Sequence, residues 1–383
     1  MKRDRWGNKR AMTQTPTSAF LSSGHRPFFL AMSAYGALAL GIWVLGLSGY
    51  VSVGPGWHGH EMIFGFAVAA MAGFLLTAVP NWTGRPPVVG TELLFLVVLW
   101  VLGRLAISTG FWPWLDCLFL PVLTARILYD IAISRNWRNI LVPLILILLA
   151  GLNVVFYFGD PAQALRLSIY VITGLMALIG GRIVPNFTAN ALQENDAPYK
   201  APRFRKSIDH VSIPSILVLV AAETFFPGSI LTGLLAFLAA SILLIRMVWW
   251  RTLQTRRTPL LWILHVGYIW IPIGYFLKAL SDIWGIFDSS AALHALTTGS
   301  IGVMILAVSS RAALGHSGRS LSADQTTVFA YILVILAGAV RVFGPIDLYA
   351  LEISGALWVL GFGLYTIVYW PILTKPRVHL DTD

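Results

Sequence analysis

The two histidines most able to do chemistry are His60 and His294, because they occupy related places in the chain. When the chain is slid along itself until His60 falls on His294, Gly65 falls on Gly299 without a gap. Two neutral imidazoles at equal depth on related helices can converge on one ion, as do the axial ligands of a haem iron. The plainer alternative is that each imidazole is hydrogen-bonded to a neighbouring helix.

Basic residues near the same depth extend this prediction. Arg104, Arg166 and Arg341 fall at the same ends of apolar segments as the two histidines. Guanidinium groups pair strongly with carboxylates, so these residues are candidates to hold the two propionates of a haem. Arg341 is the best placed, one segment after His294. The alternative is that the three side chains extend to lipid headgroups.

The other histidines form a second set of metal candidates. His58 lies about 200° from His60 if the segment is helical, so it points away and could serve a second metal or cap the interface. His25, His265 and His316 fall at the opposite ends of their segments, where they could cluster as a copper or haem site. Alternatively, these three are ordinary loop and interface histidines.

The elements that must position these residues are membrane helices. Of 383 residues, 57% are hydrophobic and 11% charged, with a mean hydropathy of +0.75. Soluble domains carry about 25% charged residues, so a soluble enzyme is excluded. The single cysteine excludes an internal disulfide and a cysteine-based cluster. The net charge of +10 is explained by basic cytoplasmic loops, and no nucleic-acid partner is expected.

The sequence predicts an all-α polytopic protein with about twelve transmembrane helices in one domain, 28–373. The evidence for the fourth span is weaker because that segment carries charged residues. The evidence for the seventh span is weaker because that segment is short. The predicted spans are 28–48, 60–80, 91–109, 112–133, 139–158, 163–185, 211–226, 229–249, 259–280, 291–313, 326–344 and 349–372.

The basic residues orient these spans. With the N-terminus inside, all but four of the 27 lysines and arginines fall in cytoplasmic segments. The exceptions are Arg104, Arg166, Lys278 and Arg341. Residues 1–27 and 374–383 are therefore expected to be cytoplasmic tails, and 1–19 lacks the apolar core of a signal peptide.

A second internal match indicates three repeats. A shorter gap-free shift puts 79–83 on 184–188 and Met71 on Met176, which relates the sixth span to the second. Since the second, sixth and tenth spans recur at intervals of four, we expect three units of four helices around a pseudo-threefold axis. The middle unit has Leu165 in place of the histidine.

At these motifs the chain resembles the NnrS family, haem- and copper-containing membrane proteins of the bacterial nitric oxide response. The most specific stretch is Trp57-His58-Gly59-His60-Glu61-Met62-Ile63-Phe64-Gly65-Phe66. Further stretches are 26–30, 73–87, 181–185, 265–268, 294–299 and 314–319. The resemblance implies haem b, copper and a place in the cytoplasmic (inner) membrane of denitrifying or nitric-oxide-stressed bacteria.

A fainter resemblance concerns the twelve-helix catalytic subunit of haem–copper oxidases and nitric oxide reductases. Their low-spin haem is held by histidines of helices two and ten, which His60 and His294 match. Those enzymes also carry metal-binding histidines on helices six and seven, and this chain has none there. The usual binuclear centre is thus absent, and no catalytic residue is assigned.

The resulting hypothesis is a haem-binding protein that handles nitric oxide or another diatomic ligand. Its haem would lie between helices two and ten near the periplasmic face and exchange electrons with a redox partner or a quinol. The alternatives are a copper- or metal-handling membrane protein and a small-solute transporter, for which repeats and buried polar residues are typical.

Overall fold

The computed structural model describes residues 19–193 and 205–378 of the chain. The predicted tails therefore lie partly outside the described residues, at 1–18 and 379–383. Within the described part, eleven helices are long and apolar enough to cross a membrane. This agrees with the prediction of an all-α polytopic membrane protein.

The helices follow the predicted spans closely. In chain order the elements are α2 (His25–Leu47), α3 (Pro55–His60), η1 (Glu61–Ala67), α4 (Val68–Thr83), α5 (Gly90–Thr109), η2 (Pro113–Leu118), α6 (Phe119–Ile133), η3 (Trp137–Asn139), α7 (Leu141–Phe158), α8 (Pro161–Gln193), α9 (Arg205–Phe225), α10 (Ile230–Met247), η4 (Val248–Trp250), η5 (Thr252–Thr255), α11 (Pro259–Trp284), α12 (Ser289–His294), η6 (Ala295–Gly302), α13 (Val303–His316), α14 (Gln325–Phe343) and α15 (Leu348–Thr374).

The fourth predicted span differs from the others. It divides into the 3-10 helix η2 and the 15-residue helix α6, which is shorter than the roughly 20 residues needed to cross a bilayer. Pro113 opens the 3-10 segment, and Asp116 within it turns inward to form an ion pair with Arg104. The first part of this predicted span is therefore a short polar segment that contacts the protein interior, and not the apolar start of a membrane-crossing helix.

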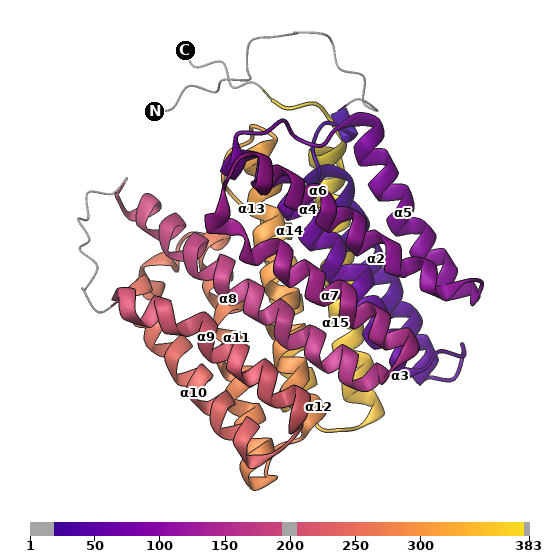
Figure 1. Cartoon of the computed structure of the whole chain (residues 1–383), viewed down its shortest axis with the longest axis vertical. Coiled ribbons are helices and arrows are strands. Elements are labelled where there is room, and N and C mark those ends of the chain that lie inside the picture. The colour runs from indigo at the N-terminus through magenta and orange to yellow at the C-terminus, as the bar shows by residue number, and fades with distance from the viewer. Residues whose placement is uncertain (1–18, 194–204, 379–383) are drawn as a thin grey trace.

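The second, sixth and tenth spans lie together at the centre of the bundle. They belong, with α11, to the most buried spans, and α8 contacts both η1 and η6 while α4 contacts α13. Figure 1 shows α5 on one flank and α9 with α10 on the opposite flank. The three helices related by the sequence shifts are thus the ones that pack around the axis.

A π-helical segment follows directly after each of the two matched histidines. η1 begins one residue after His60, and η6 begins one residue after His294. Because π-helical turns are rare and concentrate at functional sites, their occurrence at equivalent places supports the repeat that relates the second span to the tenth. It also marks this level of the bundle as a candidate site.

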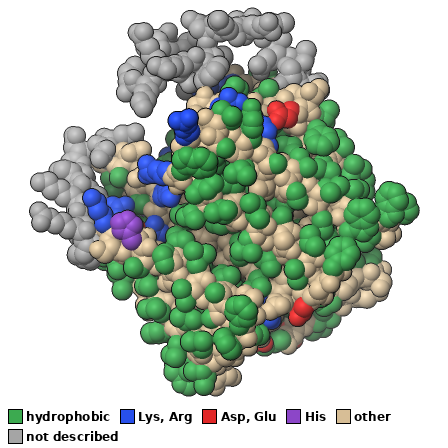
Figure 2. Space-filling view, viewed as in Figure 1, with side chains coloured by type: hydrophobic (Ala, Val, Ile, Leu, Met, Phe, Trp, Pro, Cys, Tyr) green, Lys and Arg blue, Asp and Glu red, His purple; other side chains and the backbone are tan. Residues whose placement is uncertain are grey.

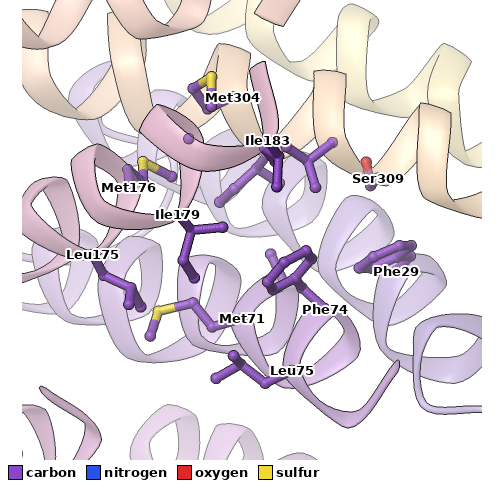
Figure 3. A pocket seen from close by; sticks show the side chains of 14 residues that line it. Phe29, Met71, Phe74, Leu75, Leu175, Met176, Ile179, Ile183, Met304 and Ser309 are labelled. Atoms are coloured by element: carbon purple, nitrogen blue, oxygen red, sulfur yellow. The ribbon is translucent and has the colours of Figure 1, made fainter. Parts of the chain in front are cut away.

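An apolar cavity of about 80 Å³ lies between the three central helices (Figure 3). We call it the axial cavity. The three helices line it at the same four register positions, which the two sequence shifts superimpose. The residues at these positions are Ala70, Met71, Phe74 and Leu75; Leu175, Met176, Ile179 and Gly180; and Met304, Ile305, Val308 and Ser309.

The outer surface suits a lipid environment. Figure 2 shows an apolar flank, with most lysines and arginines of this face gathered toward one end of the molecule. Large side chains such as Phe95, Leu144 and Phe237 are about half exposed on the flanks. In a bilayer these side chains would contact acyl chains, because the helices satisfy their own backbone hydrogen bonds.

Candidate functional site

A second cavity, of about 450 Å³, lies beside the two π-helical segments. We call it the histidine cavity. Its volume is in the range of about 300–1,000 Å³ that is usual for small-molecule sites. Apolar side chains form most of its wall. Its polar and aromatic members are Trp43, His58, Phe66, Arg166, Ser290, His294, Thr297, Thr298, Arg341, Ser354 and Trp358.

His294 has one ring nitrogen fixed and the other free. Its Nδ1–H donates to the backbone carbonyl of Ser290, one helical turn earlier, over 2.7 Å. Within the described part of the chain, Nε2 has no hydrogen-bond partner. A backbone acceptor on Nδ1 sets the tautomer of a histidine and leaves the Nε2 lone pair available for a metal.

His58 also lacks hydrogen-bond partners within the described residues. Its ring stacks on Trp43, with the ring centroids 4.8 Å apart and the planes 12° apart. Its Nδ1 atom is buried and unpaired. Because an unpaired buried polar atom costs free energy, a free imidazole here requires explanation. A ligand in the histidine cavity would provide a partner for this side chain.

The two arginines of this cavity differ in their partners. Arg341 donates from Nη2 to Ser290 Oγ over 2.9 Å, and among the described residues it forms no ion pair. Arg166 is paired with Glu223 over 3.1 Å. The guanidinium of Arg341 is therefore the cation in this cavity that remains available to an anionic group.

A separate polar cluster surrounds His60, which is fully buried. We call the group Tyr35, His60, Glu61, Arg104, Asp116 and Asn153 the arginine cluster. His60 Nδ1 lies 2.9 Å from Glu61 Oε1, and its Nε2 lies 3.2 Å from Asp116 Oδ2 and 3.0 Å from Asn153 Oδ1. Arg104 pairs with Glu61 over 2.6 Å and with Asp116, and Tyr35 donates to Glu61.

The charges of this cluster balance only if it holds one further proton. Arg104 supplies one positive charge, whereas Glu61 and Asp116 supply two negative charges, and all three side chains are buried. An uncompensated charge in such a place costs several kcal/mol, on the order of 3–5 kcal/mol. One proton shared between His60 and the carboxyls makes the cluster neutral.

The comparison with known proteins adds a family to this geometry. The model of the family described as NnrS protein matches residues 19–377, which is nearly the whole chain. The chain belongs to the NnrS family. This confirms the resemblance inferred from the motifs. A search of the curated proteins found no match.

In this NnrS chain the predicted convergence of His60 and His294 on one ligand is not found. His294 lines the histidine cavity, but His60 does not, and both ring nitrogens of His60 have partners in the arginine cluster. His58 lines the cavity instead. Residues two apart on a helix point about 200° apart, so a helix that turns His58 to the cavity turns His60 away.

Two of the three predicted arginines are also engaged elsewhere in the NnrS chain. Arg104 is held between Glu61 and Asp116 and lies in the arginine cluster. Arg166 reaches the histidine cavity but pairs with Glu223, which Lys278 also contacts over 2.9 Å. Of the three arginines predicted as propionate partners, Arg341 is the one that both lines the histidine cavity and forms no ion pair among the described residues.

The three histidines expected at the opposite face divide into a pair and a single residue. The rings of His25 and His316 lie 5.3 Å apart, and the buried Nε2 of His25 has no hydrogen-bond partner. His265 lies apart from them and hydrogen-bonds to Thr188 and Thr252 through its two ring nitrogens. Among the described residues, no group of three or more His, Cys, Asp or Glu could hold a metal ion.

The repeat itself contains a signal that separates the two histidines of the NnrS chain. The shift that superimposes His60 on His294 puts small residues at the places of the charged members of the arginine cluster. Ala295, Gly338 and Ala350 stand where Glu61, Arg104 and Asp116 stand around His60. Read in this way, the sequence would have assigned His60 to an ionic cluster and left His294 free.

Proposed function

We propose that this protein binds haem b in the histidine cavity, where His58 and His294 would hold it, and acts in the nitric oxide response. The observation that carries the proposal is that one cavity is lined by two imidazoles with unpaired ring nitrogens and by one guanidinium that forms no ion pair among the described residues. The family assignment supports the biological setting, since haem and nitric oxide are what the resemblance to NnrS proteins implies.

The residues of the cavity fit a haem. A b-type haem needs two neutral imidazoles for a six-coordinate iron and cations for two propionates. His58 and His294 carry unpaired ring nitrogens, and Arg341 is a guanidinium that forms no ion pair within the described chain. The remaining lining is mostly apolar, as the faces of a macrocycle require.

Each of these residues has a definite role. The Ser290 carbonyl holds the proton of His294 on Nδ1 and so leaves Nε2 available to a metal. Trp43 fixes the ring plane of His58 by stacking. Arg341 would neutralise a propionate, while Met62, Ile63 and Trp358 would exclude water from the cavity.

When bound, a haem would supply one-electron transfer and a site for nitric oxide. The two imidazoles that would hold it are fixed to different degrees. His294 is anchored by a hydrogen bond, whereas His58 is held by ring stacking. The His58 ring is therefore the less firmly fixed of the two.

A second candidate function is copper binding at the opposite end of the bundle. The adjacent rings of His25 and His316, with an unpaired Nε2 on His25, favour a two-histidine copper site. Copper-containing relatives are what the family resemblance implies. This site is separate from the histidine cavity, so both can be present in one protein.

The basic residues support a cytoplasmic-membrane protein with His25 and His316 on the inner side. The outer side then carries the histidine cavity, where a periplasmic redox protein or a quinol could exchange electrons with it. The gathering of lysines and arginines toward one end in Figure 2 supports this orientation.

The test is an optical spectrum of the detergent-purified protein, oxidised, reduced and reduced with nitric oxide, with iron and copper measured on the same sample. We expect sharp reduced α and β bands that change with nitric oxide, and about one iron per chain. His210→Ala serves as a control, because His210 is exposed on α9.

Two results would contradict the haem proposal. A colourless protein that holds copper would favour metal handling and leave the histidine cavity without its assigned cofactor. A colourless protein without metal would favour the transport alternative. In either case His58 and His294 would be packing residues.

A further inference from the structure

The axial cavity is not accounted for by the haem proposal. It lies between the three central helices, and each of them lines it at the same four register positions (Figure 3). Protein interiors are close-packed, so a space kept where three related helices meet is unusual, although the half-buried Phe74, Met176 and Ile179 show that it is partly open. Side chains of different size at these positions, such as Phe74, Ile179 and Val308, leave the space open.

Water is a poor occupant of the axial cavity. Ser309 contributes the single hydroxyl group among the lining residues, and that hydroxyl donates to the Leu306 carbonyl over 3.2 Å. A buried water needs about two to four polar partners, and apolar cavities without them stay dry. The volume of about 80 Å³ would otherwise admit water.

The lining favours a small, neutral and polarisable molecule. Three thioethers, those of Met71, Met176 and Met304, contribute to the wall. Figure 3 shows their sulfur atoms spread along the wall rather than meeting at one point. Soft thioether ligands could bind Cu(I), but only if they converge on it. Dispersion contacts with a gas molecule require no such convergence.

The axial cavity lies next to the histidine cavity along the bundle. Ala67 and Ile301 line the histidine cavity, and Ala70 and Met304, three residues further along the same helices, line the axial cavity. At 1.5 Å per residue this separation is about 4.5 Å. A molecule in the axial cavity is therefore about one helical turn from the histidine cavity.

We infer that the axial cavity binds a small apolar diatomic gas and passes it to the histidine cavity. Nitric oxide and oxygen share the required chemistry, being small, uncharged and soluble in the bilayer core. Binding in the cavity stands on the geometry alone, whereas delivery to a haem rests on the proposed function.

The first experiment tests binding without haem. Crystals of the full-length protein are pressurised with xenon, a probe for dry apolar cavities, and the anomalous signal is measured. We expect a xenon peak between Met71, Met176 and Met304. Ala70→Phe should abolish the peak by filling the space, and Met176→Ala should strengthen it by enlarging the space.

Ile147→Phe is the matched control, because it adds an aromatic ring on the exposed surface of α7. Its xenon peak should equal that of the unmodified protein. Absence of a xenon peak in the unmodified protein would overturn the inference. So would an acyl chain resolved in the cavity, or an anomalous copper signal on the thioethers.

The second experiment tests delivery in the haem-loaded protein by stopped flow. We expect Ala70→Phe to slow nitric oxide association several-fold, while the reduced spectrum and the final extent of binding stay unchanged. Repeating the measurement with oxygen and carbon monoxide shows whether the effect is common to small gases. An association rate equal to that of Ile147→Phe would overturn delivery and leave the xenon result to decide binding.

If no haem is found, the stopped-flow experiment cannot be carried out, but the xenon experiment still decides whether the cavity binds gas. The failure of the proposed function and the failure of this inference are therefore distinguishable.

Discussion

His58 and His60 are separated by one glycine, yet they face different polar environments. His58 stacks on Trp43 and lines the histidine cavity, whereas His60 lies between Glu61 and Asp116 in the arginine cluster. One short helix, α3, therefore carries a histidine that is free for a ligand and a histidine that completes an ionic cluster.

Charge balance in the arginine cluster gives a stability prediction. His60→Gln removes the imidazole that shares the extra proton with the carboxyls, and it leaves Glu61 and Asp116 with Arg104 as their one cation. We expect a loss of up to about 3–5 kcal/mol, the usual cost of breaking a buried ionic group. Thermal unfolding of the detergent-solubilised protein, followed by intrinsic tryptophan fluorescence, measures the change.

A double variant distinguishes charge balance from simple packing. Asp116→Asn in the His60→Gln background removes the excess negative charge while keeping the size of both side chains. We expect the double variant to be more stable than His60→Gln alone. If it is less stable by the sum of the two single effects, charge balance is not what holds the cluster together.

Hydropathy allowed the spans to be predicted, because a helix that crosses a bilayer must be apolar over its length. The predicted span 259–280 corresponds to α11, Pro259–Trp284, and 326–344 corresponds to α14, Gln325–Phe343. The fourth span was the exception, because Asp116 finds its partner on α5 and needs no contact with lipid.

The directions in which the histidine side chains point were harder to predict than the spans. The repeat made His60 and His294 equivalent in register, but the direction of a side chain depends on what neighbouring helices offer. Asn153 on α7 contacts His60 directly, and Arg104 on α5 holds the neighbouring Glu61. Asn153 has no sequence pattern that indicates its contact. Contacts between distant helices therefore decided the site.

Arg341 provides a redox prediction. Replacing it with Gln removes a positive charge from the histidine cavity, which favours the oxidised haem and should lower the midpoint potential. Arg341→Lys keeps the positive charge, so its midpoint potential should fall between those of the unmodified protein and Arg341→Gln. A spectroscopic redox titration measures all three proteins. A potential unchanged in Arg341→Gln would remove its role as propionate partner.

The His25 and His316 pair provides a metal prediction. His25→Ala and His316→Ala should each reduce the copper content of the purified protein and leave the haem spectrum unaltered. His265→Ala is the comparison, because His265 makes its hydrogen bonds to two threonines and lies outside the pair. Equal copper loss in all three variants would indicate a general effect on folding.

Orientation can be tested with single cysteines in a Cys117→Ser background. Arg256→Cys and Ile286→Cys lie in exposed loops at the two ends of α11. A membrane-impermeant maleimide should label Ile286→Cys in spheroplasts and should label Arg256→Cys only after lysis. The reverse pattern would place the histidine cavity on the cytoplasmic side.

The central claim is that His58 and His294, rather than His60, hold a haem. The most direct measurement compares reduced optical spectra and iron content of His58→Ala, His294→Ala and His60→Gln, each purified with haem available during expression. We predict that the first two lose the six-coordinate spectrum, while the folded fraction of His60→Gln keeps it. A spectrum lost in His60→Gln but retained in His58→Ala would contradict the account.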